Sequence, residues 1–542
     1  MANITIDGKP YVVKDGVTLI EAIDEARIPL PRYCYHPGLS IAGNCRICQV
    51  EVEKTPRTVI ACNTRVADGM VIHTRSPKAK ESQRVVLEFL LANHPLDCPV
   101  CDQAGECKLQ DYYMEVGLYD PKFDEMKVKK TKKAFPIGPT VMLDQERCIL
   151  CSRCVRFTDE ITKTHEFGIF NRGDHSEVDV TPGKQLDNKY SGNVVDICPV
   201  GALTDRDFRF KVRVWYLKSQ KSVCPACSRG CNMEIHYEAS RPYHLQNERI
   251  MRLKPRENHE VNQWWLCDEG RYAYRPIDFN RLKKWKMPAH GGQEEADWEK
   301  VLEKLAFLLK GTGTRTNGRW ALIASPQAAN EEIYLQKLLF KDYLKWADIG
   351  FKAPGQEGYE DDFLIKRDKN PNSTGALEIF GLSEAASDIT AIVEKAKKGE
   401  FAGIWVRDHD LAKVFGEETL RIVRQRLQVL VYEGTNGNPT ADCADFVLAG
   451  AAYAEKEGSF TNFQGRVQRI WKAVEPLGDS KPAWQILTRL AGFLGLLWNY
   501  TKPESIFNDL ARETPAFRDL SYKKIGDQGV VWRKSSASLR GA

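Results

Sequence analysis

The chain has no long hydrophobic run and no large excess of charge of either sign. Its most apolar late stretch, residues 490–498, is about half the length that a membrane-spanning helix requires. The net charge is only +5, from 78 basic and 73 acidic residues, which is too small to indicate binding to nucleic acid. The first residues, MANITIDGKPYVV, lack the apolar core of a secretory signal. We therefore expect a cytosolic protein that contacts a membrane only through partner proteins.

The motifs of several enzyme classes are also missing. No Ser–His–Asp triad, paired-carboxylate site or P-loop is apparent in the sequence. Gly311, Gly313 and Gly318 lie between a helical pattern and a strand, which reverses the strand–loop–helix order of a dinucleotide-binding loop. We expect no nicotinamide, flavin or other independent substrate site on this chain. Electrons would therefore have to come from, and pass to, other proteins.

Cysteine is scarce after residue 267 and abundant before it. Fifteen of the sixteen cysteines lie within the first 267 residues, and with one histidine they form four sets of four. Without an export signal, so many thiols are better explained as reduced metal ligands than as disulfides. Four soft ligands held close together are what an iron–sulfur cluster needs. Several clusters on one chain indicate a route for electrons.

The first set lies in a predicted domain of residues 1–78 and consists of Cys34, Cys45, Cys48 and Cys62. Two apolar runs flank Asp7-Gly8, which predicts a hairpin, and Thr18 three residues before Glu21 predicts a helix with a capping box. Hairpin, helix and cysteine loop in this order are typical of a plant-type ferredoxin of β-grasp topology. The spacing favours a [2Fe–2S] cluster over zinc, because zinc sites usually pair two short cysteine knuckles.

The second set lies in residues 79–137 and consists of His94, Cys98, Cys101 and Cys107. Residues 80–93 have a helical pattern that ends at His94-Pro95, and we expect a further helical segment to carry the set. A lone histidine would more readily be a helix cap, but the three cysteines after it favour ligation of a [4Fe–4S] cluster. A lysine-rich run at residues 127–133 is better explained as a solvated linker than as a site for an acidic partner.

The third set lies in residues 138–220 and consists of Cys148, Cys151, Cys154 and Cys198. It begins like a bacterial ferredoxin and ends in Cys198-Pro199. In a two-cluster ferredoxin another cysteine would stand at position 158, where this chain has Thr158. We therefore predict a ferredoxin-like domain that has kept one [4Fe–4S] cluster and lost its twin.

The fourth set lies in residues 221–284 and consists of Cys224, Cys227, Cys231 and Cys267. Its tight first spacings favour [4Fe–4S], with a structural zinc site as the alternative. The remaining cysteine, Cys443, is predicted to be a small buried residue rather than a ligand.

The last predicted domain, residues 285–542, alternates strands with helices. Short apolar runs lie at residues 320–324, 404–406, 429–432 and 446–448, and helical patterns at 330–345 and 382–398 separate some of them. This alternation predicts an α/β layer fold with a mostly parallel sheet. The apolar stretch at 490–498 is predicted to be a buried helix of this domain.

Together these residues resemble the large iron–sulfur subunit family of NADH–quinone oxidoreductase, respiratory complex I. The resemblance is carried over residues 1–205 by the first three sets and by the segment from Cys198 to Leu203. The fourth set and residues 452–468 resemble the molybdopterin-oxidoreductase-like part of the same family. The implied fold is a series of α+β iron–sulfur modules followed by a shortened α/β molybdopterin-oxidoreductase-like domain.

The resemblance implies a relay of electrons from the NADH- and FMN-binding partner subunit, through one [2Fe–2S] and three [4Fe–4S] clusters, towards quinone. The fourth cluster would lie off the main path. The whole complex would couple this transfer to proton translocation, with this chain in the soluble arm at the cytoplasmic face of the inner membrane. No cysteine lies between Cys267 and Cys443 to ligate molybdenum, so we expect no molybdenum cofactor.

Three other functions remain open at this point. A molybdenum formate dehydrogenase subunit would need a metal-ligating cysteine and a longer pterin-binding region, and an iron-only hydrogenase would need active-site cysteines after residue 267. The diaphorase electron-transfer subunit of an NAD-linked hydrogenase differs from a complex I subunit only in its partners. A zinc-stapled scaffold without redox activity would be colourless.

Overall fold

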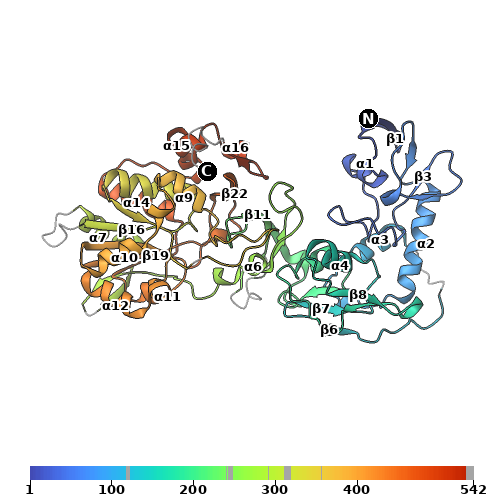
Figure 1. Ribbon diagram of the computed structural model, residues 1–542, viewed down its shortest axis with the longest axis horizontal. Helices are drawn as coiled ribbons and strands as arrows, with labels where there is room; N and C mark the ends of the chain where they lie inside the picture. The colour runs from blue at the N-terminus through green and yellow to red at the C-terminus, as the bar shows by residue number, and fades with distance from the viewer. Residues whose placement is uncertain are drawn as a thin grey trace. The chain divides into compact units, whose positions relative to one another are not determined.

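The computed structural model describes residues 1–117, 123–239, 241, 248–290, 292–310, 319–355 and 357–532. Gly311, Gly313 and Gly318, considered above for a dinucleotide loop, lie outside the described residues. The chain divides into two compact units, Met1–Leu217 and Lys218–Ala542 (Figure 1).

The first unit begins with a five-stranded sheet whose strand order is β2-β1-β5-β3-β4. The β1–β2 hairpin turns at Asp7-Gly8 as predicted, and β1 pairs in parallel with β5. The Thr18 capping box is also confirmed, since Thr18 and Glu21 each bond the other's backbone amide. The sheet and its helix enclose an apolar core with the β-grasp arrangement. The elements are β1 (Ala2–Ile6), β2 (Lys9–Val13), α1 (Leu19–Glu25), β3 (Gln49–Val52), β4 (Val59–Ile60) and β5 (Val71–His73).

A long helix, α2 (Pro77–Asn93), then leads to the second set of ligands. Ser76 caps its beginning and His94 stands at its end, as the sequence predicts. The ligand segment itself is not the helix that we expected. Between α2 and α3 (Lys108–Val116) it forms a loop with one short 3₁₀ turn, Cys98–Val100.

The rest of the first unit surrounds the third set. A three-stranded sheet has the order β10-β7-β6, and β8 pairs with β9 in a separate hairpin. The helix after Cys151 begins as α4 and continues as a π-helical turn, Phe157–Ile161. The elements are β6 (Ala134–Pro136), β7 (Val141–Asp144), α4 (Arg153–Arg156), β8 (Phe167–Phe170), β9 (Glu177–Val180), α5 (Asn193–Ile197) and β10 (Leu203–Asp205).

The second unit begins with a three-stranded sheet that supports the fourth set. Its strands are in sequence order, and a short helix follows Cys267. The elements are β11 (Leu217–Val223), β12 (Asn232–Glu238), β13 (Ile250–Pro255) and α6 (Asp268–Arg271).

A seven-stranded sheet of order β15-β14-β20-β19-β18-β16-β17 forms the centre of the second unit. The five strands from β20 to β17 are parallel, and β14 and β15 extend the sheet with antiparallel pairing. All four predicted strands are present. The strands are β14 (Trp285–Ala289), β15 (Gly292–Ala296), β16 (Arg319–Ile323), β17 (Asp348–Gly350), β18 (Phe401–Arg407), β19 (Val429–Gly434) and β20 (Phe446–Ala449).

Both faces of this sheet are buried, so its strands are apolar on both sides. Leu322 of β16 points into one core with the helices α7, α8, α9, α14 and α15, whereas its neighbours Ala321 and Ile323 point into a second core with α10, α11 and α12 (Figure 1). The helices are α7 (Trp298–Leu309), α8 (Asn330–Gln336), α9 (Ser373–Phe380), α10 (Thr390–Lys397), α11 (Leu411–Phe415), α12 (Glu417–Arg426), α13 (Pro439–Asp442), α14 (Ala483–Leu494), α15 (Pro503–Glu513) and α16 (Tyr522–Ile525).

Two of the helix predictions for this unit differ from the structure. The pattern at 382–398 is helical only from Thr390, because the segment before it pairs with Phe351 and Lys352, whose amides donate to the carbonyl of Ser387. The apolar stretch at 490–498 is helical only as far as Leu494, and Leu497 is 92% exposed. A last small sheet of β21 (Gly458–Thr461), β22 (Arg466–Ile470) and β23 (Val530–Val531) completes the unit.

Candidate metal centres

The first set is gathered within the β-grasp domain. Cys34, Cys45 and Cys48 come from the loop before β3, and Cys62 lies in a 3₁₀ turn after β4. The Cys34 thiol is hydrogen-bonded to those of Cys45 and Cys62, and the Cys48 thiol is bonded to that of Cys62. These sulfur–sulfur hydrogen bonds lower the pKa of Cys34 and raise that of Cys62. All four predicted ligands are therefore side by side.

The backbone of this loop points amides at the sulfurs. The amide of Cys34 donates to Cys45 Sγ at 3.4 Å, and that of Ile47 donates to the same thiol. Gly43 (φ 63°) and Arg46 (φ 58°) adopt left-handed conformations, which is strained for an arginine. Amides that converge on sulfur stabilise a reduced, more negative cluster.

The second set is the most exposed of those in the first unit. Cys98 is exposed, whereas Cys101 is buried and Cys107 is half-buried beside the start of α3. The three thiols are close enough to raise one another's pKa, although burial is the larger cause for Cys101 and Cys107.

His94 lies at the end of α2 beside Arg147, the same arginine that lies near Cys101. Burial, followed by the charges of Arg147 and Lys127, lowers the pKa of His94 to about 4. The imidazole is therefore neutral near pH 7, which is the form that binds metal.

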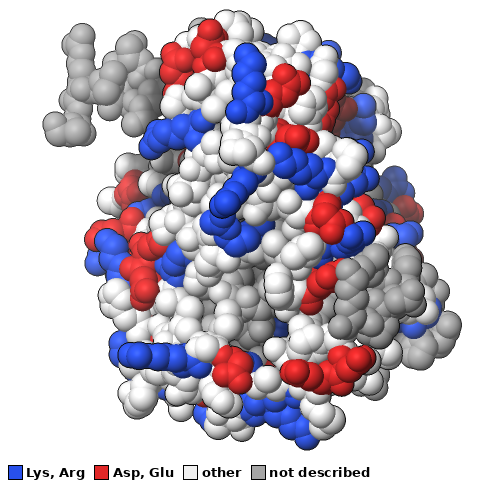
Figure 2. Space-filling view, turned by 90° about the vertical axis from the view of Figure 1, so that its right-hand side faces the viewer, with Lys and Arg blue, Asp and Glu red and all other residues white. Residues whose placement is uncertain are grey.

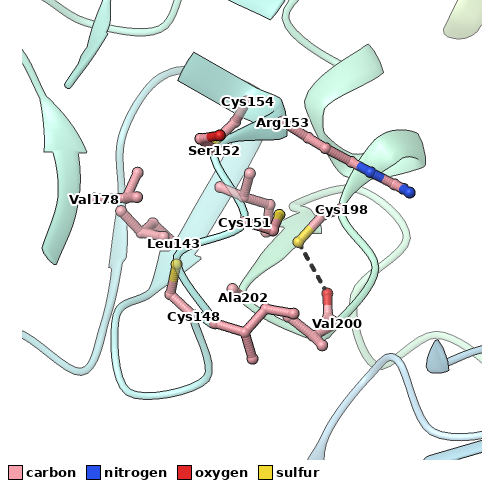
Figure 3. Close-up of a pocket in the computed structure, with 12 residues that line it drawn as sticks. Leu143, Cys148, Cys151, Ser152, Arg153, Cys154, Val178, Cys198, Val200 and Ala202 are labelled. Atoms are coloured by element: carbon pink, nitrogen blue, oxygen red, sulfur yellow. Dashed lines mark hydrogen bonds between the residues drawn. The ribbon is translucent and has the colours of Figure 1, made fainter. Parts of the chain in front are cut away.

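The third set lines a single cavity with apolar walls (Figure 3). The walls include Leu143, Val178 and Ala202. Burial raises the pKa of Cys148 and of Cys198 to about 12, so these thiols need a metal to become thiolates near neutral pH. The lining residues present four sulfurs and no carboxylate, a donor set suited to an iron–sulfur cluster.

Backbone amides are also directed at these sulfurs. The amide of Leu150 donates to Cys148 Sγ at 3.4 Å, and the amide of Arg153 donates to Cys151. Leu150 (φ 54°) and Ser152 (φ 60°) are both left-handed, on either side of Cys151. Such strain in two non-glycine residues is typical of a functional loop. Thr158, at the position where a twin cluster would need a cysteine, is buried and donates to the carbonyl of Val155 at 3.0 Å.

The fourth set lies in the second unit, and all four of its cysteines are buried. Cys224, Cys227 and Cys231 come from the loop between β11 and β12, where the amide of Cys224 donates to the carbonyl of Cys231 at 2.8 Å. Cys267 stands at the start of α6 and accepts from the amide of Gly270 at 3.3 Å. A Cβ on Gly270 would lie 2.8 Å from Cys224 Sγ, so the two cysteines converge on this glycine.

Among the residues that the structure describes, no three His, Cys, Asp or Glu side chains surround a point that could hold a single ion. A cluster is bound differently, because its ligands attach to separate iron atoms. No position for a metal is therefore inferred from these side chains.

Within the first unit the three sets share one apolar core. Cys34 and Cys151 belong to this core, and Cys107 and Cys148 pack against it. The third set is also joined to the second by the segment after Cys198. A Cβ on Gly201 would lie 2.2 Å from Cys101 Sγ, and the amide of Lys108 donates to the carbonyl of Pro199 at 3.1 Å.

The first and third sets are joined by two arginines that the sequence analysis did not single out. Arg153 and Arg156 of α4 donate to carbonyls of the loop that carries Cys34. These partners are more than a hundred residues away in the sequence, so no local pattern identifies them.

The lysine-rich run is not simply a solvated linker. Lys127 donates to the carbonyls of Leu91 and Ala92 at the end of α2, at 2.9 Å each. Three further lysines of the run also contact the same unit: Lys130 bonds the carbonyl of Ser176, Lys132 pairs with Asp179, and Lys133 pairs with Asp97 and Glu146. Figure 2 shows basic and acidic side chains intermixed over the face that it presents, in keeping with the small net charge.

Five family models match the chain in series. Residues 1–77 match a 2Fe-2S iron–sulfur cluster binding domain, and residues 83–122 match the NADH-ubiquinone oxidoreductase-G iron–sulfur binding region. Residues 138–204 match the ferredoxin-like domain of NADH-quinone oxidoreductase subunit 3. Residues 217–278 match the molybdopterin oxidoreductase Fe4S4 domain, and residues 287–493 match molybdopterin oxidoreductase.

Curated relatives are similar over nearly the whole chain. The NADH-ubiquinone oxidoreductase 75 kDa subunit of Reclinomonas americana is 42% identical, with 94% of this chain and 90% of the relative covered. The mitochondrial 78 kDa subunit of Neurospora crassa is 30% identical, with 95% and 83% covered, and the NADH-quinone oxidoreductase-G protein of Rickettsia conorii is 28% identical, with 96% and 92% covered. The last alignment spans 627 positions, more than the 542 residues of this chain, so the relative has internal insertions that this chain lacks.

A solved structure of an NAD+-reducing [NiFe]-hydrogenase in the H2-reduced state is 28% identical, covering 39% of this chain and 91% of its own. Its TM-score of 0.36 is too low to support any argument about fold or function.

Proposed function

This chain belongs to the NADH-quinone oxidoreductase-G family, which includes the mitochondrial 75 and 78 kDa proteins and supplies electron-transfer subunits to respiratory complex I, and we propose that its four ligand sets form the electron path. The cofactors would be one [2Fe–2S] cluster on Cys34, Cys45, Cys48 and Cys62, and three [4Fe–4S] clusters on the other sets. The observation that carries this proposal is the gathering of three sets in one core of the first unit.

The contacts between the sets support an order for the transfer. Electrons would pass from the first set to the third, through the region where α4 contacts the Cys34 loop, and then to the second across Gly201 and Cys101. The order in space therefore differs from the order in sequence. The fourth set belongs to the other compact unit and would lie off this path.

The surface around the second set supports an exit at that end. Cys98 is exposed, and Leu96 (89% exposed) and Val100 lie beside it in the sequence, with Phe89 and Met114 exposed on α2 and α3. Exposed apolar side chains of this kind mark surfaces that a partner covers. The partner would be another iron–sulfur protein of the soluble arm, whereas the NADH- and FMN-binding subunit would deliver electrons at the first set.

The remaining parts of the proposal concern the whole complex. No described helix is long and apolar enough to cross a membrane, which is compatible with a peripheral subunit held by its partners. We place it at the cytoplasmic face of the inner membrane, in a complex that couples electron transfer to proton translocation. The molybdopterin-oxidoreductase-like domain would act as a scaffold without molybdenum and without its own substrate site.

Iron and sulfide analysis of anaerobically purified protein, combined with EPR during a redox titration, tests this function. One two-iron and three four-iron clusters give about fourteen irons per chain. Cys48→Ser should abolish the two-iron signal, whereas Cys443→Ser should leave every signal unchanged, because Cys443 is packed against the core of the second unit. A colourless protein with zinc in place of iron would refute the proposal.

A further inference from the structure

Two arginines of α4 connect the loop of the first set to that of the third. Arg156 Nη2 donates to the carbonyl of Cys34 at 2.5 Å and to the carbonyl of Cys151 at 3.4 Å. Its Nη1 bonds the carbonyl of Ser40, and its Nε bonds Ser152 Oγ at 3.2 Å. One planar guanidinium therefore contacts the main chain of a proposed ligand from each set.

Neighbouring contacts hold the same two segments together. Arg153 Nη1 donates to the carbonyl of Ile197 at 2.8 Å, next to Cys198, and its Nη2 bonds the carbonyl of Tyr35, next to Cys34. On the other side, Asn44 donates to the carbonyl of Leu150 at 3.2 Å. The amide of Ser40 donates to Glu160 at 2.8 Å. Arg156 lies within this interface and is the residue that contacts both Cys34 and Cys151.

We propose that Arg156 is a positioning residue for the electron step between the first and third clusters, because its guanidinium holds the main chains of Cys34 and Cys151 at a fixed separation. The inference rests on the proposed function, since both clusters belong to it. The step moves one electron from the reduced first cluster to the oxidised third cluster, and no bond or proton changes place.

Two physical effects follow from this position. Electron transfer slows steeply as the gap between donor and acceptor widens, so a looser interface lowers the rate. The positive charge also stabilises the reduced, more negative state of both clusters, which raises their midpoint potentials. Lysine would keep the charge but not the planar fork that reaches several carbonyls at once. The two effects can therefore be separated by substitution.

The experiment uses the complete complex, purified without air, with Arg156→Gln, Arg156→Lys and the control Arg172→Gln. Arg172 is an exposed arginine of the same unit. Iron content, the EPR midpoint potential of each cluster and the rate at which NADH reduces the third cluster are measured. Arg156→Gln should retain both clusters, lower both midpoints and slow the step by about tenfold, a typical effect of residues around a metal site. Arg156→Lys should restore the midpoints but not the rate.

Wild-type midpoints and rate in Arg156→Gln would overturn this inference. Loss of iron from both Arg156 variants, but not from Arg172→Gln, would also overturn it, because the residue would then act in cluster assembly. If the unsubstituted complex has neither cluster signal, the proposed function itself fails. Normal clusters with unaffected variants refute only the role of Arg156.

Discussion

Arg281 and Glu455 form an ion pair in which neither side chain is exposed to solvent, with Nη2 and Oε2 2.8 Å apart. Glu455 also accepts from Arg249 at 2.6 Å, so one buried carboxylate serves two arginines. Glu455→Gln would leave these arginines without a counter-charge. Removing one partner of a buried pair costs about 3–5 kcal/mol, so the substitution should lower the free energy of unfolding of the second unit by that amount.

Denaturant unfolding checks this prediction, and Asp479→Asn is the matched control. Asp479 pairs with Lys284 at 2.8 Å, but both side chains are more than half exposed, so its loss should cost less than about 1 kcal/mol. Equal effects of the two substitutions would show that the buried pair has no special role in stability.

Gly201→Ala should displace a ligand of the second cluster. The added Cβ would lie 2.2 Å from Cys101 Sγ, and a sulfur bound to iron cannot move aside freely. We expect the variant to lose the iron of one four-iron cluster and its EPR signal. Gly492→Ala is the control, because nothing lies within 4 Å of its added Cβ, and it should retain all the iron. A full iron content in Gly201→Ala would contradict the arrangement around Cys101.

His94→Cys should keep a cluster but shift its midpoint potential downward. A neutral imidazole replaced by a thiolate adds a negative charge, which disfavours reduction. An EPR redox titration measures the shift, and His165→Cys, at an exposed histidine of the same unit, should leave every midpoint unchanged. An unchanged or higher midpoint in His94→Cys would count against His94 as a ligand.

Glu331 should make the second unit less stable as the pH rises from about 4.5 to about 7. Burial raises its pKa to about 7 in the folded chain, and the ordinary value is 4.5. Its stabilising contribution is therefore complete below pH 4.5 and is lost as the folded form deprotonates, by up to about 3 kcal/mol. Ser459 and Tyr522 donate to this carboxyl group, each at 2.8 Å.

Thermal unfolding over this pH range checks the effect. Glu331→Gln cannot ionise and should remove this part of the pH dependence, whereas Glu378→Gln, at an exposed position of α9, should not. The same pH dependence in wild type and Glu331→Gln would assign it to another group.

The sequence predicted those parts of the fold that depend on neighbouring residues. The hairpin at Asp7-Gly8 and the capping box at Thr18 are local, so a few residues determine them. The strands around Ile404 and Leu430 were also identifiable, because burial on both faces requires continuous apolar runs.

The sequence did not predict features that depend on distant contacts. The helical pattern before Thr390 gives way to pairing with Phe351 and Lys352, which tertiary structure alone provides. The cysteine spacings indicated four sets, but not that the third would lie between the first and the second. That order depends on Arg156 and Gly201, whose partners in the other sets are far away along the chain.

The apolar core shared by the first three sets has a consequence for maturation. Cys34, Cys107 and Cys148 each belong to a different set, yet they pack into or against the same group of side chains. Inserting iron at one site therefore organises the walls of the next. Assembly of the unit should be cooperative, so that a chain deprived of one cofactor matures poorly as a whole rather than missing a single redox step.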